Sequence, residues 1–232
     1  MTKKHEWIPI SEVYAKKGKE GVKEALKHLK MVGYSLSSHF NDTYMFEMKK
    51  FSSIIPHCPK CGYRLDFTLT NPEYKLGKPN KDSADCLYPA ARKAYKYDLS
   101  STYDGLTIAT SAFKMFCEKN GYGKDMIFKG FKEDVGHFHL LVKKKIKFDT
   151  LKKETRFEKL CPECGNYESV VGAYPAFLLV TKPLSDGFYC SDLLFASGNE
   201  KSPLILVGIK TYQRLKASKL KGLEFEPAYG LD

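Results

Sequence analysis

The chain has 232 residues, 43% of them hydrophobic and 13% aromatic, so it has enough apolar material for a folded core and is not a disordered polypeptide. It contains no apolar run near the roughly 20 residues of a membrane helix, and its first residues lack the apolar segment of a secretory signal. The formal net charge of +11 indicates an acidic partner, either nucleic acid or an acidic protein, or serves solubility alone. We expect a cytoplasmic protein with no membrane contact.

The N-terminal part of the chain predicts one helix followed by strands and a long loop. From Gly18 to Gly33, apolar residues recur at helical spacing, lysines cover the opposite face, and Gly33 is suited to cap the end. We interpret residues 1–35 as an N-terminal extension that carries this helix. Alternating apolar residues then predict strands at 44–48 (Tyr44, Phe46 and Met48) and at 64–69. The composition of residues 71–85, rich in polar residues with two prolines and a glycine, predicts a loop.

The remainder of the chain alternates short strands with two helices. The helix expected at 111–120 places Phe113, Phe116 and Cys117 on one face and ends before Gly121. The second helix is expected at 210–218, and a charged stretch at 149–159 leads into the second cysteine pair. Short apolar runs predict strands at 106–108, 126–128, 137–142, 146–148, 170–171, 177–180, 204–207 and 223–225.

Two copies of one cysteine motif dominate the chemistry of the sequence. Cys58-Pro59-Lys60-Cys61-Gly62 recurs as Cys161-Pro162-Glu163-Cys164-Gly165. Thiolates two residues apart can turn toward one ion, and glycine lets the backbone amides approach the sulfurs. Four cysteines complete the tetrahedron that structural zinc prefers, and a closed tetrahedron leaves no open position for catalysis. We expect one structural Zn²⁺ held by all four cysteines, joining distant parts of the chain.

Other arrangements of these cysteines remain open from the sequence. Each pair can bind its own ion with other ligands, His57 can replace one cysteine, or the pairs can be metal-free. An odd total of seven cysteines in a reducing compartment favours metal over disulfides. We interpret Cys86, Cys117 and Cys190 as small buried hydrophobic residues.

The order of the predicted elements suggests an internal duplication. Three pairs of anchors recur in the same order: Cys58 and Cys161 are 103 residues apart, Leu106 and Leu204 98, and Phe128 and Phe225 97. We therefore predict a pseudo-symmetric α+β fold of duplicated strand-helix-strand units, pinned by the shared Cys₄ zinc site. The first repeat half spans residues 36–135, the second spans 136–232, and together they form one compact unit.

The paired motifs also carry a resemblance to a known family. Together with a C-terminal block, they are similar to the double-CXXCG immunity proteins of bacterial polymorphic-toxin systems, a group first seen as myxobacterial paralogues. The block comprises residues 192–194, 204–207, Tyr212, Leu215 and 220–227. The resemblance begins near Tyr44, leaves out the first forty residues, and differs in that this chain is rich in lysine. It implies a zinc-stabilised protein that binds and neutralises a cognate toxin delivered by a neighbouring cell.

Other clusters of polar residues have two interpretations each. His137 and His139 share one strand face and can bind a metal or lie on a half-exposed strand. Glu224 and Glu226 can be a site or edge charges. The lysines at 143–145, 147, 152 and 153 can bind a nucleic-acid backbone, form a solvated hairpin, or face an acidic toxin.

No motif of a known enzyme class occurs in the sequence. It lacks a phosphate-binding loop, a dinucleotide fingerprint, a zinc-protease motif and a nucleophile elbow. We therefore expect a binding protein and not an enzyme. The first hypothesis is toxin neutralisation, with a toxin of acidic surface as partner, and the alternative is a zinc-ribbon-like protein that binds nucleic acid through its lysines.

Overall fold

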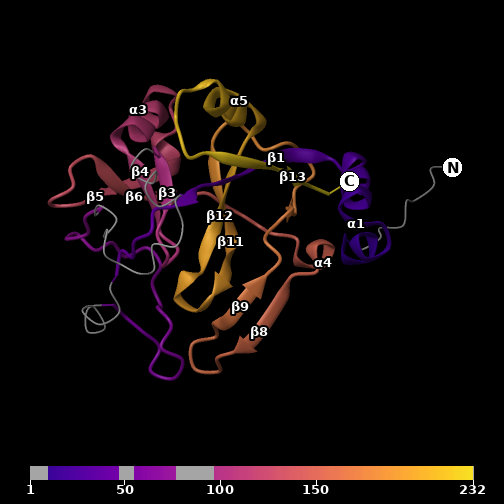
Figure 1. The fold of residues 1–232 in the computed structure, drawn as a ribbon, viewed down its shortest axis with the longest axis horizontal. Helices are drawn as coiled ribbons and strands as arrows, with labels where there is room; N and C mark the ends of the chain where they lie inside the picture. The colour runs from indigo at the N-terminus through magenta and orange to yellow at the C-terminus, as the bar shows by residue number, and fades with distance from the viewer. Residues whose placement is uncertain (1–9, 47–54, 77–96, 232) are drawn as a thin grey trace.

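The computed structural model describes residues 10–46, 55–76 and 97–231, and it confirms the predicted α+β class (Figure 1). Its larger sheet has the strand order β10-β13-β1-β12-β11-β9-β8, with β7 paired to β11 outside this order. Its smaller sheet has the order β2-β3-β4-β6-β5. The larger sheet comprises β1 (Met31–Ser37), β7 (Lys145–Ile146), β8 (Arg156–Leu160), β9 (Tyr167–Val171), β10 (Ala176–Phe177), β11 (Phe188–Ser197), β12 (Ser202–Val207) and β13 (Glu224–Tyr229). The smaller comprises β2 (His39–Phe40), β3 (Leu99–Ser101), β4 (Thr107–Thr110), β5 (Met126–Gly130) and β6 (His137–Val142).

Helices flank the sheets, and none in the described residues is long and apolar enough to cross a bilayer. In Figure 1, α3 and α5 lie at one end of the sheets, and α1 lies beside the C-terminal end of the chain. The helical elements are α1 (Ile10–Lys27), α3 (Ser111–Lys119), α4 (Thr150–Lys153), α5 (Ile209–Ala217) and the 3₁₀ turns η2 (Gly123–Asp125) and η3 (Gly198–Glu200).

Four strands of each sheet follow the same plan, as the predicted duplication requires. In β3-β4-β6-β5 and in β11-β12-β1-β13, every neighbouring pair is antiparallel. A helix directly follows the second strand of each set, α3 after β4 and α5 after β12.

Each set of four strands takes one strand from another part of the chain. β1, most of which lies in the predicted N-terminal extension, pairs with β12 and β13 of the second half. β6 lies at the start of the second half but pairs with β4 and β5 of the first half. Each set is therefore complete only when distant parts of the chain fold together.

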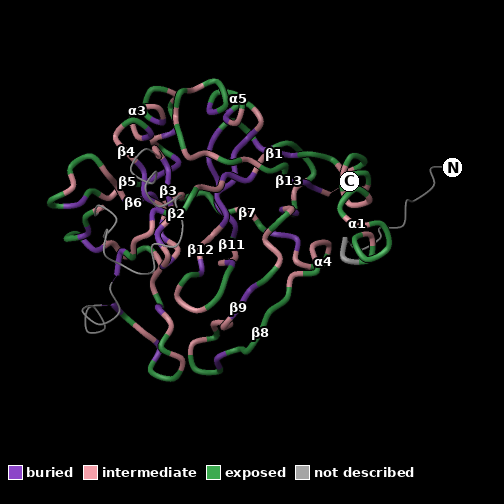
Figure 2. The backbone as a smooth tube through the Cα atoms, in the orientation of Figure 1, coloured by how far each residue is buried: buried purple, intermediate pink, exposed green. Residues whose placement is uncertain are grey.

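The hydrophobic core also joins the halves. Phe188 is fully buried, with its ring centroid 6.1 Å from that of Phe113 and 5.3 Å from that of Tyr122. Phe113 and Cys117 form the buried face of α3, as predicted, and Leu215 of α5 enters the same cluster. Figure 2 shows the buried backbone concentrated where the two sheets meet beneath α3 and α5.

The N-terminal helix differs from its prediction at both ends. It spans Ile10–Lys27, with a non-helical residue at Gly18 (φ +60°), and does not continue to Gly33. Residues 31–37 instead form β1, which pairs with β12 and β13, and Gly33 permits the close approach of β12, since a Cβ atom there would come within 2.6 Å of the Val207 carbonyl oxygen. The predicted apolar face is retained, since Val22, Leu26 and Leu29 pack against Phe177 and Tyr229.

The predicted strand at 44–48 is wrong for its described residues, and Met48 lies outside them. The backbone N–H groups of Met45 and Phe46 donate to the Asp104 carboxylate at 3.0 and 3.1 Å, so a side chain replaces a neighbouring strand as their acceptor. Their apolar side chains are nonetheless buried.

The predicted strand at 64–69 is also wrong. Only Arg64 forms a bridge, with His57, and the Asp66 carboxylate then accepts the Thr68 N–H at 2.8 Å in a tight turn. Of the predicted loop at 71–85, residues 71–76 are irregular, and the rest lies outside the described residues, as does Cys86.

Candidate metal centre

The first cysteine motif folds as a tight knuckle. The Cys58 N–H donates to the Tyr63 carbonyl at 2.9 Å, and the Gly62 N–H donates to the Cys58 carbonyl at 2.8 Å. Gly62 has φ +71°, in the left-handed region that favours glycine. This turn directs the thiols of Cys58 and Cys61 toward one point.

The second motif repeats this geometry closely. The Cys161 N–H donates to the Asn166 carbonyl at 2.8 Å, the Gly165 N–H donates to the Cys161 carbonyl at 2.9 Å, and Gly165 also has φ +71°. The same hydrogen bonds therefore form at equivalent positions of both motifs, which lie 103 residues apart in sequence.

The structure brings all four predicted ligands together. The Sγ atoms of Cys58 and Cys161 lie 3.8 Å apart, those of Cys61 and Cys164 lie 3.7 Å apart, and all four lie within 4.8 Å of one another. A tetrahedron with Zn–S bonds of about 2.3 Å has sulfur–sulfur edges of about 3.8 Å, whereas a disulfide requires about 2.0 Å. The four sulfurs therefore fit a single tetrahedral ion, and His57 is not among the grouped ligands.

The thiols of the cluster differ in acidity. N–H groups of Cys164 and Glu163 lower the pKa of Cys161 to about 7, because they donate to its thiolate. Burial raises the pKa of Cys61 to about 12. The Asn166 side-chain amide donates to the Cys164 sulfur at 3.4 Å. Some thiols therefore keep their protons near neutral pH unless a bound cation favours the thiolate form.

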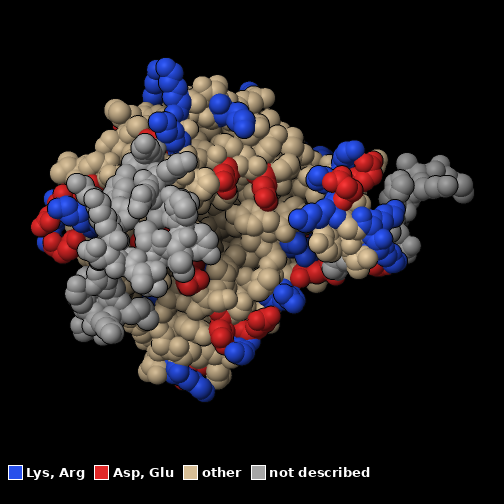
Figure 3. Space-filling model, in the orientation of Figure 1, with Lys and Arg blue, Asp and Glu red and all other residues tan. Residues whose placement is uncertain are grey.

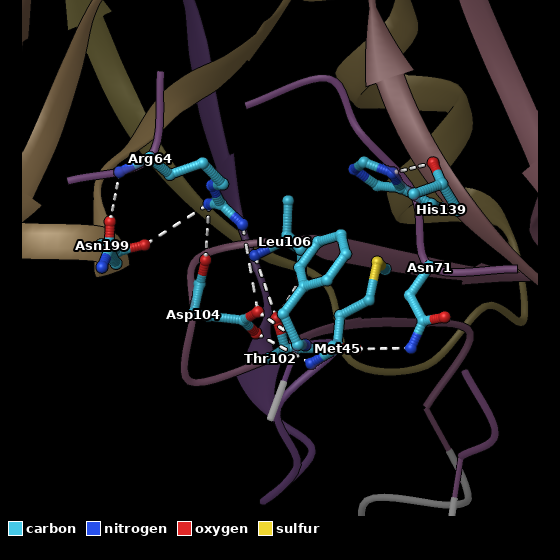
Figure 4. Close-up of polar contacts among 10 residues, drawn as sticks. Met45, Arg64, Asn71, Thr102, Asp104, Leu106, His139 and Asn199 are labelled. Atoms are coloured by element: carbon cyan, nitrogen blue, oxygen red, sulfur yellow. Dashed lines mark hydrogen bonds and ion pairs between the residues drawn. The ribbon is translucent and has the colours of Figure 1, made fainter. Parts of the chain in front are cut away.

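The first knuckle is attached to the second half of the chain through η3. The Arg64 N–H donates to the Asn199 side-chain oxygen at 2.7 Å, and the Arg64 guanidinium donates to the Asn199 carbonyl at 3.4 Å (Figure 4). Gly105, also in the first half, packs directly against η3, where a Cβ atom on residue 105 would lie only 2.3 Å from the Glu200 carbonyl oxygen. Both contacts attach the first half of the chain, including the segment after the first knuckle, to η3.

Arg64 lies at the centre of this contact and is only 3% exposed. Its guanidinium donates to the Asp104 carbonyl at 3.0 Å, lies 3.9 Å from the Asp104 carboxylate, and lies 4.7 Å from the centroid of the Phe67 ring. Burial lowers its pKa. A pocket of about 400 Å³ opens beside it, lined in part by Tyr44 and Tyr63. The sequence analysis missed Arg64, although it directly follows the first knuckle.

Lys201 is a second residue that the sequence analysis missed. It follows η3, is 3% exposed, donates from Nζ to the Tyr167 carbonyl, and has this atom 5.0 Å from the centroid of the Tyr63 ring. Burial lowers the pKa of its amine, and the thiolates of Cys61 and Cys164 act in the opposite direction. Nothing in the sequence distinguishes it from the other lysines.

The two histidines of β6 do not form a metal site with the described residues. The His139 imidazole is buried and lies 2.7 Å from the Thr70 hydroxyl (Figure 4), whereas the His137 imidazole lies 2.6 Å from the Asp134 carboxylate. His139 is a core residue, held by a side chain from the segment after the first knuckle. Burial lowers its pKa to about 3.

His139 predicts a specific pH dependence of stability. Its pKa falls from 6.5 in the unfolded chain to about 3 in the folded protein, so the folded state disfavours protonation. The stability from this group is complete above pH 6.5 and is lost as the pH falls toward 3. Between pH 7 and 5, wild type should lose about 2 kcal/mol more of its unfolding free energy than His139→Gln. Urea unfolding at both pH values measures this, and equal losses would contradict the assignment.

The predicted lysine cluster does not act as one uniform surface. Lys144 lies 2.6 Å from the buried Asp125 carboxylate, and Lys152 lies over the Phe177 ring at 5.6 Å. On the face in Figure 3, basic and acidic side chains alternate without a continuous basic stripe. Glu224 lies 3.1 Å from the His39 imidazole.

Comparisons with known proteins add no relative. No model of a known protein family matches the chain, and no curated protein matches it significantly.

Proposed function

We propose that Cys58, Cys61, Cys161 and Cys164 hold one structural Zn²⁺. The sulfur spacings of 3.7 and 3.8 Å, close to the edge of a zinc tetrathiolate, carry this proposal. Soft thiolates in a tetrahedron favour zinc over calcium or magnesium, which prefer oxygen ligands. The ion joins one knuckle from each half and so stabilises the contact between the halves.

We further propose that this zinc-stabilised fold is an immunity protein that binds and neutralises a cognate bacterial toxin domain. The resemblance of the paired knuckles and of the C-terminal block (residues 192–194, 204–207, Tyr212, Leu215 and 220–227) to double-CXXCG immunity proteins supports this function. The residues of that block lie in β11, β12, α5 and β13 and in the turn before β13, so they belong to the larger sheet and the helix packed on it. The net charge of +11 favours a toxin with an acidic surface.

A rescue assay tests the immunity function directly. Immunity genes of this kind usually lie beside their toxin genes, so the C-terminal domain encoded by the adjacent gene is the first toxin to express in a test bacterium. Co-expression of this protein should restore survival, and the two proteins should co-purify. A variant without the second knuckle, Cys161→Ser with Cys164→Ser, should protect poorly because it loses the proposed zinc centre and much of its stability.

The survival result is interpreted together with the folding and zinc content of the expressed protein. Toxicity that persists while the protein is folded and zinc-loaded would contradict the immunity function and leave the zinc centre intact. Binding to a mixed oligonucleotide that weakens steeply between 50 and 200 mM salt would then favour the nucleic-acid alternative.

A further inference from the structure

Lys201 has a buried charge that no carboxylate in the described part of the chain balances. It is 3% exposed, and its amine donates to one acceptor, the Tyr167 carbonyl. Among the described residues, no carboxylate lies within ion-pair distance of this amine. A buried ammonium group is costly unless an anion compensates it. Within the described part of the chain, the compensating anion is therefore a group other than a carboxylate.

The position of Lys201 indicates which group this is. Tyr63 follows Cys61 by two residues, and its ring lies on one side of the ammonium group. Tyr167 follows Cys164 by three residues, and its carbonyl accepts the hydrogen bond on the other side. The ammonium group is thus held between the segments that leave the two knuckles, and the negative charges of the Cys61 and Cys164 thiolates raise the pKa of its amine.

A divalent ion with four thiolates carries a net charge of −2, which needs compensation in a partly buried site. We propose that Lys201 is the counter-cation of the Cys₄ centre and favours its fully deprotonated, zinc-bound form. This inference rests on the proposed zinc centre. It assigns Lys201 two effects: the ammonium group increases zinc affinity, and it draws electron density from the bound thiolates and makes them less nucleophilic.

The experiment compares variants that separate charge from hydrogen bonding. Lys201→Gln removes the charge but can still donate to the Tyr167 carbonyl, whereas Lys201→Arg keeps the charge. Lys144→Met is the matched control, because Lys144 pairs with the buried Asp125 beside Gly187, at the opposite end of β11 from Lys201. Zinc affinity is measured by chelator competition at fixed pH, and thiolate reactivity by the rate at which iodoacetamide alkylates the zinc-loaded protein.

We expect Lys201→Gln to bind zinc at least about tenfold more weakly and to be alkylated several times faster than wild type. Lys201→Arg should stay within about threefold of wild type in both measurements. Lys144→Met should be less stable, with unchanged zinc affinity and alkylation rate. If wild type takes up no zinc, the proposed centre itself is wrong.

Wild-type affinity and reactivity in Lys201→Gln would overturn the inference and leave the zinc centre standing. If Lys201→Gln does not fold, Lys201→Met replaces it as the neutral variant. Failure of both neutral variants to load zinc while Lys201→Arg loads it supports the inference. Failure of Lys201→Arg as well overturns it, because retained charge would then not suffice.

Discussion

Replacing Cys161 with serine should remove the bound zinc and lower the free energy of unfolding by at least about 4 kcal/mol. The Cys161 sulfur lies 3.8 Å from that of Cys58 in the other half, so its loss opens the shared tetrahedron. Structural zinc contributes its binding free energy directly to folding, and three thiolates hold the ion far more weakly than four. Urea unfolding of wild type and variant, both purified in excess zinc, measures the difference.

A double variant shows whether the two knuckles share this stabilisation. If one ion depends on both, Cys58→Ser combined with Cys161→Ser should cost little more than either change alone. Separate ions would make the two losses add. Cys117→Ala is the control, since Cys117 is fully buried on the inner face of α3 and outside the cluster, and the variant should lose about 1 kcal/mol while keeping its zinc.

Replacing Arg64 with methionine should cost about 3–5 kcal/mol of stability. The change keeps an unbranched apolar stem but removes the guanidinium donors to the Asn199 and Asp104 carbonyls, and it leaves the buried Asp104 carboxylate without its nearby cation. The contact between the first knuckle and η3 should loosen, so zinc affinity should fall as well. Thermal unfolding with and without excess zinc measures both effects.

Lys129→Met is the comparison for Arg64→Met, because Lys129 donates to the Thr68 carbonyl from an exposed position. It should change stability by less than about 0.5 kcal/mol. A similarly small effect of Arg64→Met would show that the buried guanidinium does not organise the joint between the halves.

The features that the sequence predicted well are local. Each cysteine motif contains its own turn, with glycine at the position that needs a positive φ. The knuckles can therefore be recognised from the sequence without knowledge of the fold. The helix α3 has its Thr110 N-cap and a buried face of Phe113 and Cys117 within one short segment. β6 is bounded at the predicted residues because its apolar run ends at the lysines after Val142.

The features that the sequence did not reveal depend on distant partners. β1 is a strand because it pairs with β12 and β13 of the second half, although the preceding helical periodicity continues into it. β8 was missed because all of its residues are exposed, so no apolar alternation marks it. Lys201 and Arg64 acquire their roles only when η3 meets the first knuckle.

The central claim is that one metal ion joins the two knuckles, and metal counting in matched variants tests it most directly. Zinc per chain is measured by elemental analysis of wild type and of two variants, Cys58→Ser with Cys61→Ser and Cys161→Ser with Cys164→Ser. The shared centre predicts about one zinc in wild type and none in either variant. Two zinc ions in wild type, or one ion retained after loss of a single knuckle, would contradict it.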